Sequence, residues 1–146
     1  MNTDNASTEI LQLSTDQNKC DDELLGGPGE PLQGSMDTDE QLIELVRALH
    51  PHKPYCLVES WTIFNVDVTE EELNKIHAVG QLPMILFAHN VRFDSERRFD
   101  VGDWVRSTFA ISFEEEFLFE TRNTIYVLRG PGHKKSASLK TVLSFF

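Results

Sequence analysis

All fourteen aromatic residues of this 146-residue chain lie between Tyr55 and Phe146, and none precedes them. The first forty residues instead carry ten acidic side chains against Lys19 alone, which accounts for −9 of the net charge of −11. A polar segment without aromatics cannot bury enough apolar surface to offset the entropy that it loses on ordering. We therefore expect residues 1–36 to be a disordered acidic arm and residues 37–146 to be a single folded domain.

The composition of the chain also bounds where it works. No run approaches the ~18–20 apolar residues that span a bilayer, and the polar start MNTDNASTEI does not resemble a signal peptide. The two cysteines, Cys20 and Cys56, do not read as a disulfide framework and fit a reducing compartment. We expect a cytoplasmic protein without membrane contact.

Two helices are predicted by their capping signals. Thr38 and Thr69 each precede a segment with apolar residues at helical spacing, and each is followed three residues later by Gln or Glu. In this arrangement side chain and backbone cap each other. The first helix should end near His50, because a proline follows, and the second should end at Gly80.

The rest of the domain is predicted to be mostly β. Apolar runs and alternation predict a sheet of about five strands, from the segments 55–64, 84–93, 103–113 and 139–146 and from 117–120 and 123–130, which could form a pair. In the first of these, Leu57, Trp61 and Ile63 should share one face, whereas GPGHKKSAS is predicted to be a turn or loop. The element order indicates an α+β fold of two short helices and a largely antiparallel sheet. The aromatic residues expected in its core are Trp61, Phe87, Trp104, Phe109 and Tyr126.

Two segments carry a resemblance: AHNVRFDSERRFDVGDWVRS (88–107) and FLFETRNTIYVLRGPGHKK (117–135). They resemble a family of small uncharacterised domains from bacteria and their prophages, in which similar GDWV and ETRNT-YVL-GPG stretches occur. The resemblance covers about residues 50–135 and leaves the acidic arm outside. That family brings no established catalytic residues, so the resemblance implies a context of bacteria and mobile elements but no chemistry.

Two charged segments are candidate binding sites. Residues 92–106 interleave four arginines with acids. An arginine offers a planar pair of donors to a carboxylate or phosphate, which favours a recognition loop. Mixed charges more often form a solvated ion-pair network. Residues 121–146 carry five bases and no acid, but GPGHKK lacks the arrangement of a P-loop. The candidate binding residues are Arg92, Arg97, Arg98, Arg106, Arg122, Arg129, His133, Lys134 and Lys135.

Metal and catalytic chemistry have weaker signals. His50, His52 and Cys56 are three potential metal ligands in one short segment, but a fourth ligand and the CxxC or HExxH spacings are absent, so we predict neither a metal site nor a cofactor. His89 followed by Asp94 could orient a general base. No Ser or Cys lies in a recognisable nucleophile motif, and a lone histidine on an apolar strand is more often a core residue. No catalytic residue is predicted.

Three functional hypotheses follow, in this order. The first is a non-enzymatic binding protein, an inhibitor or regulator from a prophage or mobile element that docks on a host protein such as a nuclease or defence complex. The second is a weak nucleic-acid-binding regulator that uses the basic C-terminal strip; the overall acidity argues against strong duplex binding. The third is a small hydrolase using His89 and nearby acids.

Overall fold

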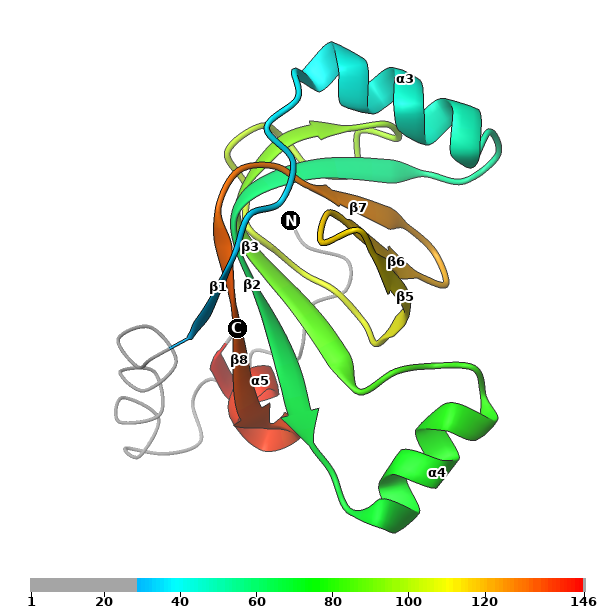
Figure 1. The fold of residues 1–146 in the computed structure, drawn as a ribbon, viewed down its shortest axis with the longest axis vertical. Helices are drawn as coiled ribbons and strands as arrows, with labels where there is room; N and C mark the ends of the chain where they lie inside the picture. Colours follow the sequence, from blue (N-terminus) through cyan, green and yellow to red (C-terminus); the bar gives the residue numbers. More distant parts are fainter. Residues whose placement is uncertain (1–28, 146) are drawn as a thin grey trace.

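The structure of the protein is a computed structural model that describes residues 29–145 (Figure 1). Among these residues, no helix is long and apolar enough to cross a membrane. The elements of the described part follow in the order β1 (Glu30–Leu32), α3 (Asp39–Leu49), β2 (Tyr55–Asp67), α4 (Glu70–Ala78), β3 (Met84–Asp94), β4 (Val105–Arg106), β5 (Ala110–Glu114), β6 (Leu118–Thr121), β7 (Ile125–Leu128), β8 (Gly132–Ser138) and α5 (Leu139–Phe145).

The long strand β2 organises the sheet. It pairs antiparallel with β3 along most of its length, and parallel first with β7 and then with β8. Between these two partners lies Ser60, whose φ of 54° interrupts the strand geometry. Because side chains alternate with a period of two, such an irregularity moves every later residue to the other face. Trp61 therefore packs inside the sheet, whereas Leu57 lies in the cluster under α3, and the predicted common face of these residues is wrong.

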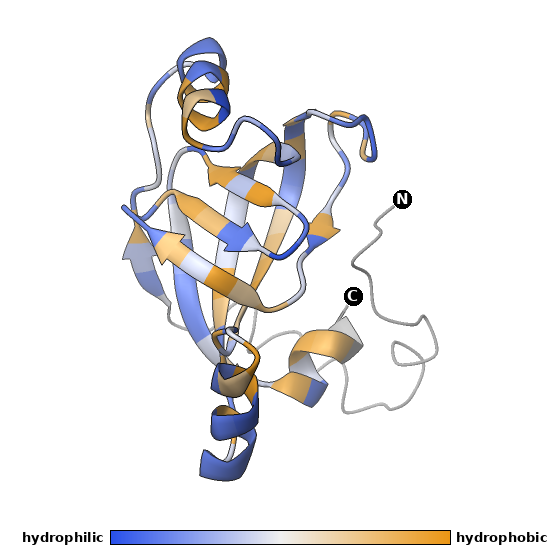
Figure 2. Cartoon of the chain, turned by 90° about the vertical axis from the view of Figure 1, so that its right-hand side faces the viewer, coloured by the Kyte–Doolittle hydropathy of each residue, from blue (hydrophilic) through white to orange (hydrophobic). Residues whose placement is uncertain are grey.

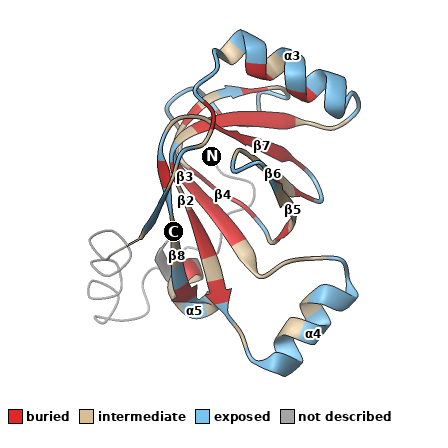
Figure 3. Cartoon of the chain, viewed as in Figure 1, coloured by how far each residue is buried: buried red, intermediate tan, exposed pale blue. Residues whose placement is uncertain are grey.

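The sheet curves back on itself around its core. The strands β5, β6, β7, β2, β3 and β4 are hydrogen-bonded in succession. The circuit returns to β5 because Ser107 N donates to Leu86 O and Leu82 N donates to Ala110 O, each at 2.8 Å. The enclosed cluster contains the fully buried rings of Trp61 and Tyr126, and Figure 3 shows the burial concentrated in these strands.

Of the helices in the described residues, α3 and α5 cover the outside of this curved sheet and α4 does not. Leu42 and Val46 of α3 pack against residues of β2 and β7, and Val142 of α5 packs in a cluster with residues of β2, β3 and β8. The helix α4 has no buried residue and projects from the body with a largely hydrophilic surface (Figure 2). Arg122 Nη2 donates to the carbonyl of Val79 at 2.8 Å, which links the end of α4 to the β6–β7 turn.

The predicted helices and the α+β class are confirmed. Thr38 and Thr69 both close complete capping boxes, and α3 is capped at His50. The sheet is larger and more mixed than predicted, since residues 29–145 alone contribute eight strands and β2 makes two parallel pairings. The predicted strand 103–113 is divided into β4 and β5, and the predicted pairing of segments 117–120 and 123–130 is confirmed as β6 with β7.

The last two predicted elements are wrong. GPGHKKSAS was expected to be a loop, but Gly132–Ser138 forms β8 between β1 and β2. Only Gly132 and Ala137 of this strand are buried, so it has no apolar alternation to reveal it. LKTVLSFF was expected to be a strand, but Leu139–Phe145 forms the helix α5. The Ser138 hydroxyl caps the start of this helix, since it accepts a hydrogen bond from Thr141 N at 3.1 Å.

The predicted boundary of the acidic arm is also wrong. Glu30–Leu32 forms β1 and pairs with β8, and Leu32 packs against the core. Ser35 is buried; its N–H donates to Leu128 O at 2.9 Å, and its carbonyl accepts from Gly130 N at 2.8 Å. The fold thus includes residues 30–35, and residues 1–28 of the predicted arm lie outside the described residues.

The predicted aromatic core is confirmed for three of its members. Trp61, Phe87 and Tyr126 are at most 5% exposed. Trp104 and Phe109 are only half-buried and pack at the margin of the cluster beneath α5.

Candidate functional site

Two of the candidate binding arginines converge on Asp39, at the start of α3, and on Glu59 of β2. Arg92 Nη2 lies 2.9 Å from Asp39 Oδ2, and its Nη1 lies 3.2 Å from Glu59 Oε2. Arg129 Nε lies 3.3 Å from Asp39 Oδ1 and donates to the carbonyl of Asp37 at 3.0 Å. The hydrogen bond from Arg92 holds the pKa of Asp39 below its usual range. These four charges therefore tie the first turn of α3 to the sheet.

A third arginine is held by a buried carboxylate. Arg98 Nη2 lies 2.6 Å from Asp94 Oδ1, whose side chain is fully buried, and Arg98 Nη1 donates to Thr124 Oγ1 at 2.7 Å. The Arg98 N–H also donates to Asp94 Oδ2 at 2.6 Å. This bidentate contact fixes the loop after β3 against the β6–β7 turn, so the structure gives Arg98 an architectural part.

The other candidate binding residues are dispersed. Arg97 is exposed in a turn with φ of 54°, Arg106 is buried, and Arg122 lies against the end of α4. Of the basic strip on β8, His133 is exposed, whereas Lys134 and Lys135 are half-buried. Among the nine candidates, the structure brings together only Arg92 and Arg129 through shared carboxylates.

The two chemical groupings weighed from the sequence are not assembled. Cys56 is fully buried in the core, where burial raises the pKa of its thiol, so it cannot join His50 and His52 around an ion. In the part of the chain that the structure describes, no three His, Cys, Asp or Glu side chains are placed to hold a metal ion. His89 is exposed beside Phe87 and is not a core residue, and Asp94 is engaged by Arg98.

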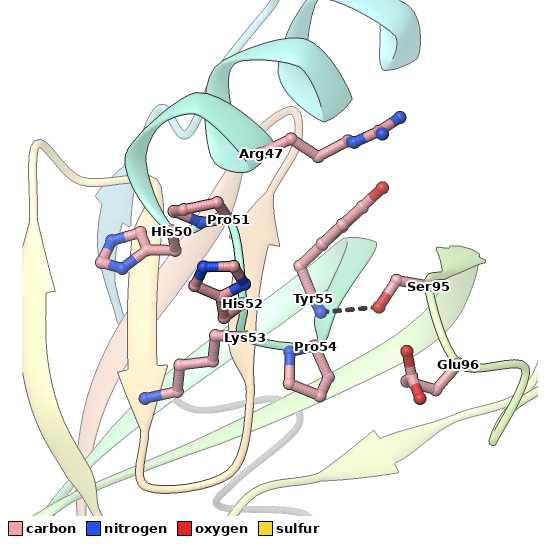
Figure 4. A pocket seen from close by; sticks show the side chains of 9 residues that line it. All are labelled: Arg47, His50, Pro51, His52, Lys53, Pro54, Tyr55, Ser95 and Glu96. Atoms are coloured by element: carbon pink, nitrogen blue, oxygen red, sulfur yellow. Dashed lines mark hydrogen bonds between the residues drawn. The ribbon is translucent and has the colours of Figure 1, made fainter.

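A hollow of about 290 Å³ lies between the His50-Pro51-His52 segment that follows α3 and the loop after β3 (Figure 4). Tyr55 N donates to Ser95 Oγ and Ser95 N donates to Tyr55 O, each at 2.9 Å, which fixes the loop beside the start of β2. The side chains that line the hollow are Arg47, His50, Pro51, His52, Lys53, Pro54, Tyr55, Ser95 and Glu96.

The hollow has a mixed lining. Lys53 is neutralised, since its Nζ lies 2.6 Å from Glu120 Oε2. Neither Arg47 nor Glu96 makes an ion pair with any described residue. Arg47 extends from α3 on the side where the Tyr55 hydroxyl lies, with Glu96 on the opposite side (Figure 4). The hollow thus offers one cation, one anion and two imidazoles around an aromatic ring.

Sequence reasoning named the two histidines of this hollow, but it missed Arg47, Tyr55, Ser95 and Glu96. The signal for Arg47 was present, because it lies in the last turn of a helix whose end was predicted. Sequence alone could not place Ser95 and Glu96 in the hollow. Their position depends on the register between β2 and β3, in which Cys56 is opposite Asp94.

Comparison with known proteins gives one finding. The chain matches a family described as a domain of unknown function, DUF6957, over residues 33–144. It belongs to this family. The match is consistent with the resemblance to small uncharacterised domains and extends it on both sides of residues 50–135. The family region starts at the end of β1 and includes every residue of the hollow. No curated protein and no solved structure matches the chain.

Proposed function

We propose that this domain is a non-enzymatic binding protein that docks on another protein, with the hollow between α3 and the loop after β3 as a socket for a partner side chain. The proposal includes the finer hypothesis from the sequence: a cytoplasmic inhibitor or regulator, encoded by a bacterial prophage or mobile element, whose partner is a host protein such as a nuclease or defence complex.

The observation that carries the proposal is the mixed charge of the hollow. A protein segment presents both signs of charge together with apolar groups, so it can satisfy both Arg47 and Glu96 while it packs on Tyr55. Beside the hollow, Phe93 is 39% exposed, with its ring centroid 6.0 Å from that of Tyr55, and aromatic side chains are enriched in protein interfaces.

The same observation disfavours nucleic acid at this place. The hollow lies at the C-terminal end of α3, where the helix dipole is equivalent to roughly half a negative charge. Glu96 adds a full negative charge, so a phosphate would meet repulsion as well as Arg47. Nucleic-acid binding by the basic strip is the second candidate. The charges of the β8 lysines favour it, but these lysines are half-buried and Arg129 of the strip is taken by Asp39 and Asp37.

The test is affinity purification of the tagged full chain from the cells that encode it, followed by mass spectrometry of proteins and measurement of co-purifying nucleic acid. Arg47→Glu reverses the cationic charge of the hollow. Arg122→Glu is the matched control, because it makes the same change on an arginine of the basic strip that lies outside the hollow.

We expect one protein to be enriched with the wild type and with Arg122→Glu, and to be lost with Arg47→Glu. Equal recovery of that protein with Arg47→Glu would remove the hollow from the interface. Recovery of nucleic acid that disappears with Arg122→Glu would favour the second candidate instead.

A further inference from the structure

In the described part of the chain, β5 forms one edge of the sheet. At the end of the strand order, β5 pairs with β6 on one side, and on its other side the only backbone bond is that of Ala110 O with Leu82 N. The edge beyond Ala110 therefore presents the backbone groups of residues 111–114, and Figure 1 shows no strand beyond it. An unpaired edge of this kind is a template for an added strand.

Two other edges of the sheet, at β1 and β4, are blunted. The outer strand β1 has only three residues and contains Pro31, which has no N–H to donate. The strand β4 has only two residues, so it offers almost no ladder to a newcomer. Short edge strands and edge prolines are devices that prevent unwanted pairing. The edge of β5 carries neither device, and its one irregularity is a register shift between Ala110 and Ser112, at the start of the strand.

The end of this edge is strongly acidic. Glu114, Glu115 and Glu116 are all exposed, and none of them forms an ion pair with a described residue. Glu115 and Glu116 also have φ of 55° and 63°, a conformation that glycine or asparagine adopts at lower cost. The half-buried side chains of Ile111 and Phe113 add apolar surface along the same strand. The edge is thus suited to an extended segment that is positively charged.

We infer that β5 is a docking edge for an extended, basic segment of the partner protein, which adds to the sheet as a further strand beside residues 111–114. The inference rests on the proposed function in that the partner is a protein. Backbone hydrogen bonds supply the affinity, and the three glutamates select lysine or arginine side chains at the tip of the hairpin. The net charge of −11 disfavours a second copy of this chain as the occupant.

The test uses the full chain and three short peptides. The first alternates lysine with valine, the second alternates glutamate with valine, and the third is the lysine peptide with alternate amides N-methylated. Binding is measured by calorimetry at low and high salt, and the bound edge is located by hydrogen exchange. We expect the lysine peptide alone to bind, to slow exchange at residues 111–114, and to weaken with salt.

A pair of variants isolates the acidic tip. The double variant Glu115→Asn and Glu116→Gly removes two charges but supplies the residues that a turn with positive φ prefers, so the hairpin is kept. The double variant Glu70→Gln and Glu71→Gln removes two exposed charges from α4 and gives the same net charge. We expect the first to weaken the lysine peptide about fivefold and the second to leave it unchanged.

The inference is overturned if no peptide binds at low salt, if the N-methylated peptide binds equally well, or if residues 111–114 exchange as fast with the peptide as without it. Concentration-dependent self-association that protects the same amides would assign the edge to a second copy and also overturn it. The same experiments distinguish failure of this inference from failure of the proposed function. A captured partner that depends on Arg47 but leaves residues 111–114 unprotected supports that function and refutes this inference.

Discussion

Gly132 on β8 tests the packing that sequence reasoning failed to foresee. A Cβ atom added to this residue would lie 2.3–2.6 Å from three ring atoms of Trp61. Real Cβ atoms essentially never approach so closely, and the Trp61 side chain is only 1% exposed, so it has no solvent-facing space into which to move. The ring is also held by a hydrogen bond from its Nε1 to the carbonyl of Gly130 at 3.2 Å.

Overpacking of a filled core typically costs about 1–3 kcal/mol, and we expect Gly132→Ala to reach the upper end of that range. For a domain of this size, about 3 kcal/mol corresponds to a fall in Tm of roughly 6–12 °C. Urea unfolding followed by tryptophan fluorescence gives the free energy of unfolding. Ser136→Ala is the matched control, because it changes an exposed residue of the same strand.

A double-mutant cycle with Trp61→Phe identifies the cause. The smaller ring leaves room for the added methyl group, so Gly132→Ala should cost clearly less when it is combined with Trp61→Phe than when it is made in the wild type. If Gly132→Ala unfolds like the wild type, or if its cost is the same with and without Trp61→Phe, the close packing of β8 on Trp61 is refuted.

Three further predictions concern the rest of the fold. Thr38→Ala should lower the free energy of global unfolding by about 1 kcal/mol, whereas Thr69→Ala should mainly speed hydrogen exchange within α4, which buries nothing; equal global effects would contradict this. Asp39→Asn removes a carboxyl whose pKa is lowered in the folded state. The wild type should therefore be more stable than the variant above the ordinary aspartate pKa, and this advantage should be lost as the pH falls through the lower folded pKa. Urea titrations in which the stabilities of wild type and variant do not converge at low pH would refute it. Deleting residues 1–28 should leave Tm within a few degrees, whereas deleting residues 1–36 should lower it because β1 and the Ser35 contacts are lost; thermal melts of the two truncated chains decide this.

The sequence predicted what local chemistry determines. Both capping boxes and the helix end before Pro51 follow from residues that are neighbours in the chain. The apolar run 84–93 likewise predicts a strand that is buried for much of its length. The prediction failed where a residue responds to distant contacts. Gly132–Ser138 is polar and follows a Gly-Pro-Gly turn, so only its place between β1 and β2 makes it a strand.

The candidate site shows the same division. His50 and His52 stand out in the sequence, but Ser95 and Glu96 join them only through the pairing of β2 with β3. Arg92 and Arg98 were identified as recognition groups from residue type alone. Their partners Asp39 and Asp94 could not be assigned without the fold, because a guanidinium that binds a ligand and one that braces a helix have the same sequence signal.

The arrangement of β2 has a consequence for folding during synthesis on the ribosome. Tyr55 pairs with Ile125, seventy residues later, and the second half of β2 waits for residues 132–138. At a synthesis rate of about 5–20 residues per second, the strand emerges roughly 4–14 s before these partners exist. During that interval β3 can cover one edge of β2, while its other edge has no native neighbour to pair with. The nascent chain is therefore most vulnerable to misassociation in these seconds, when a chaperone would be most useful to it.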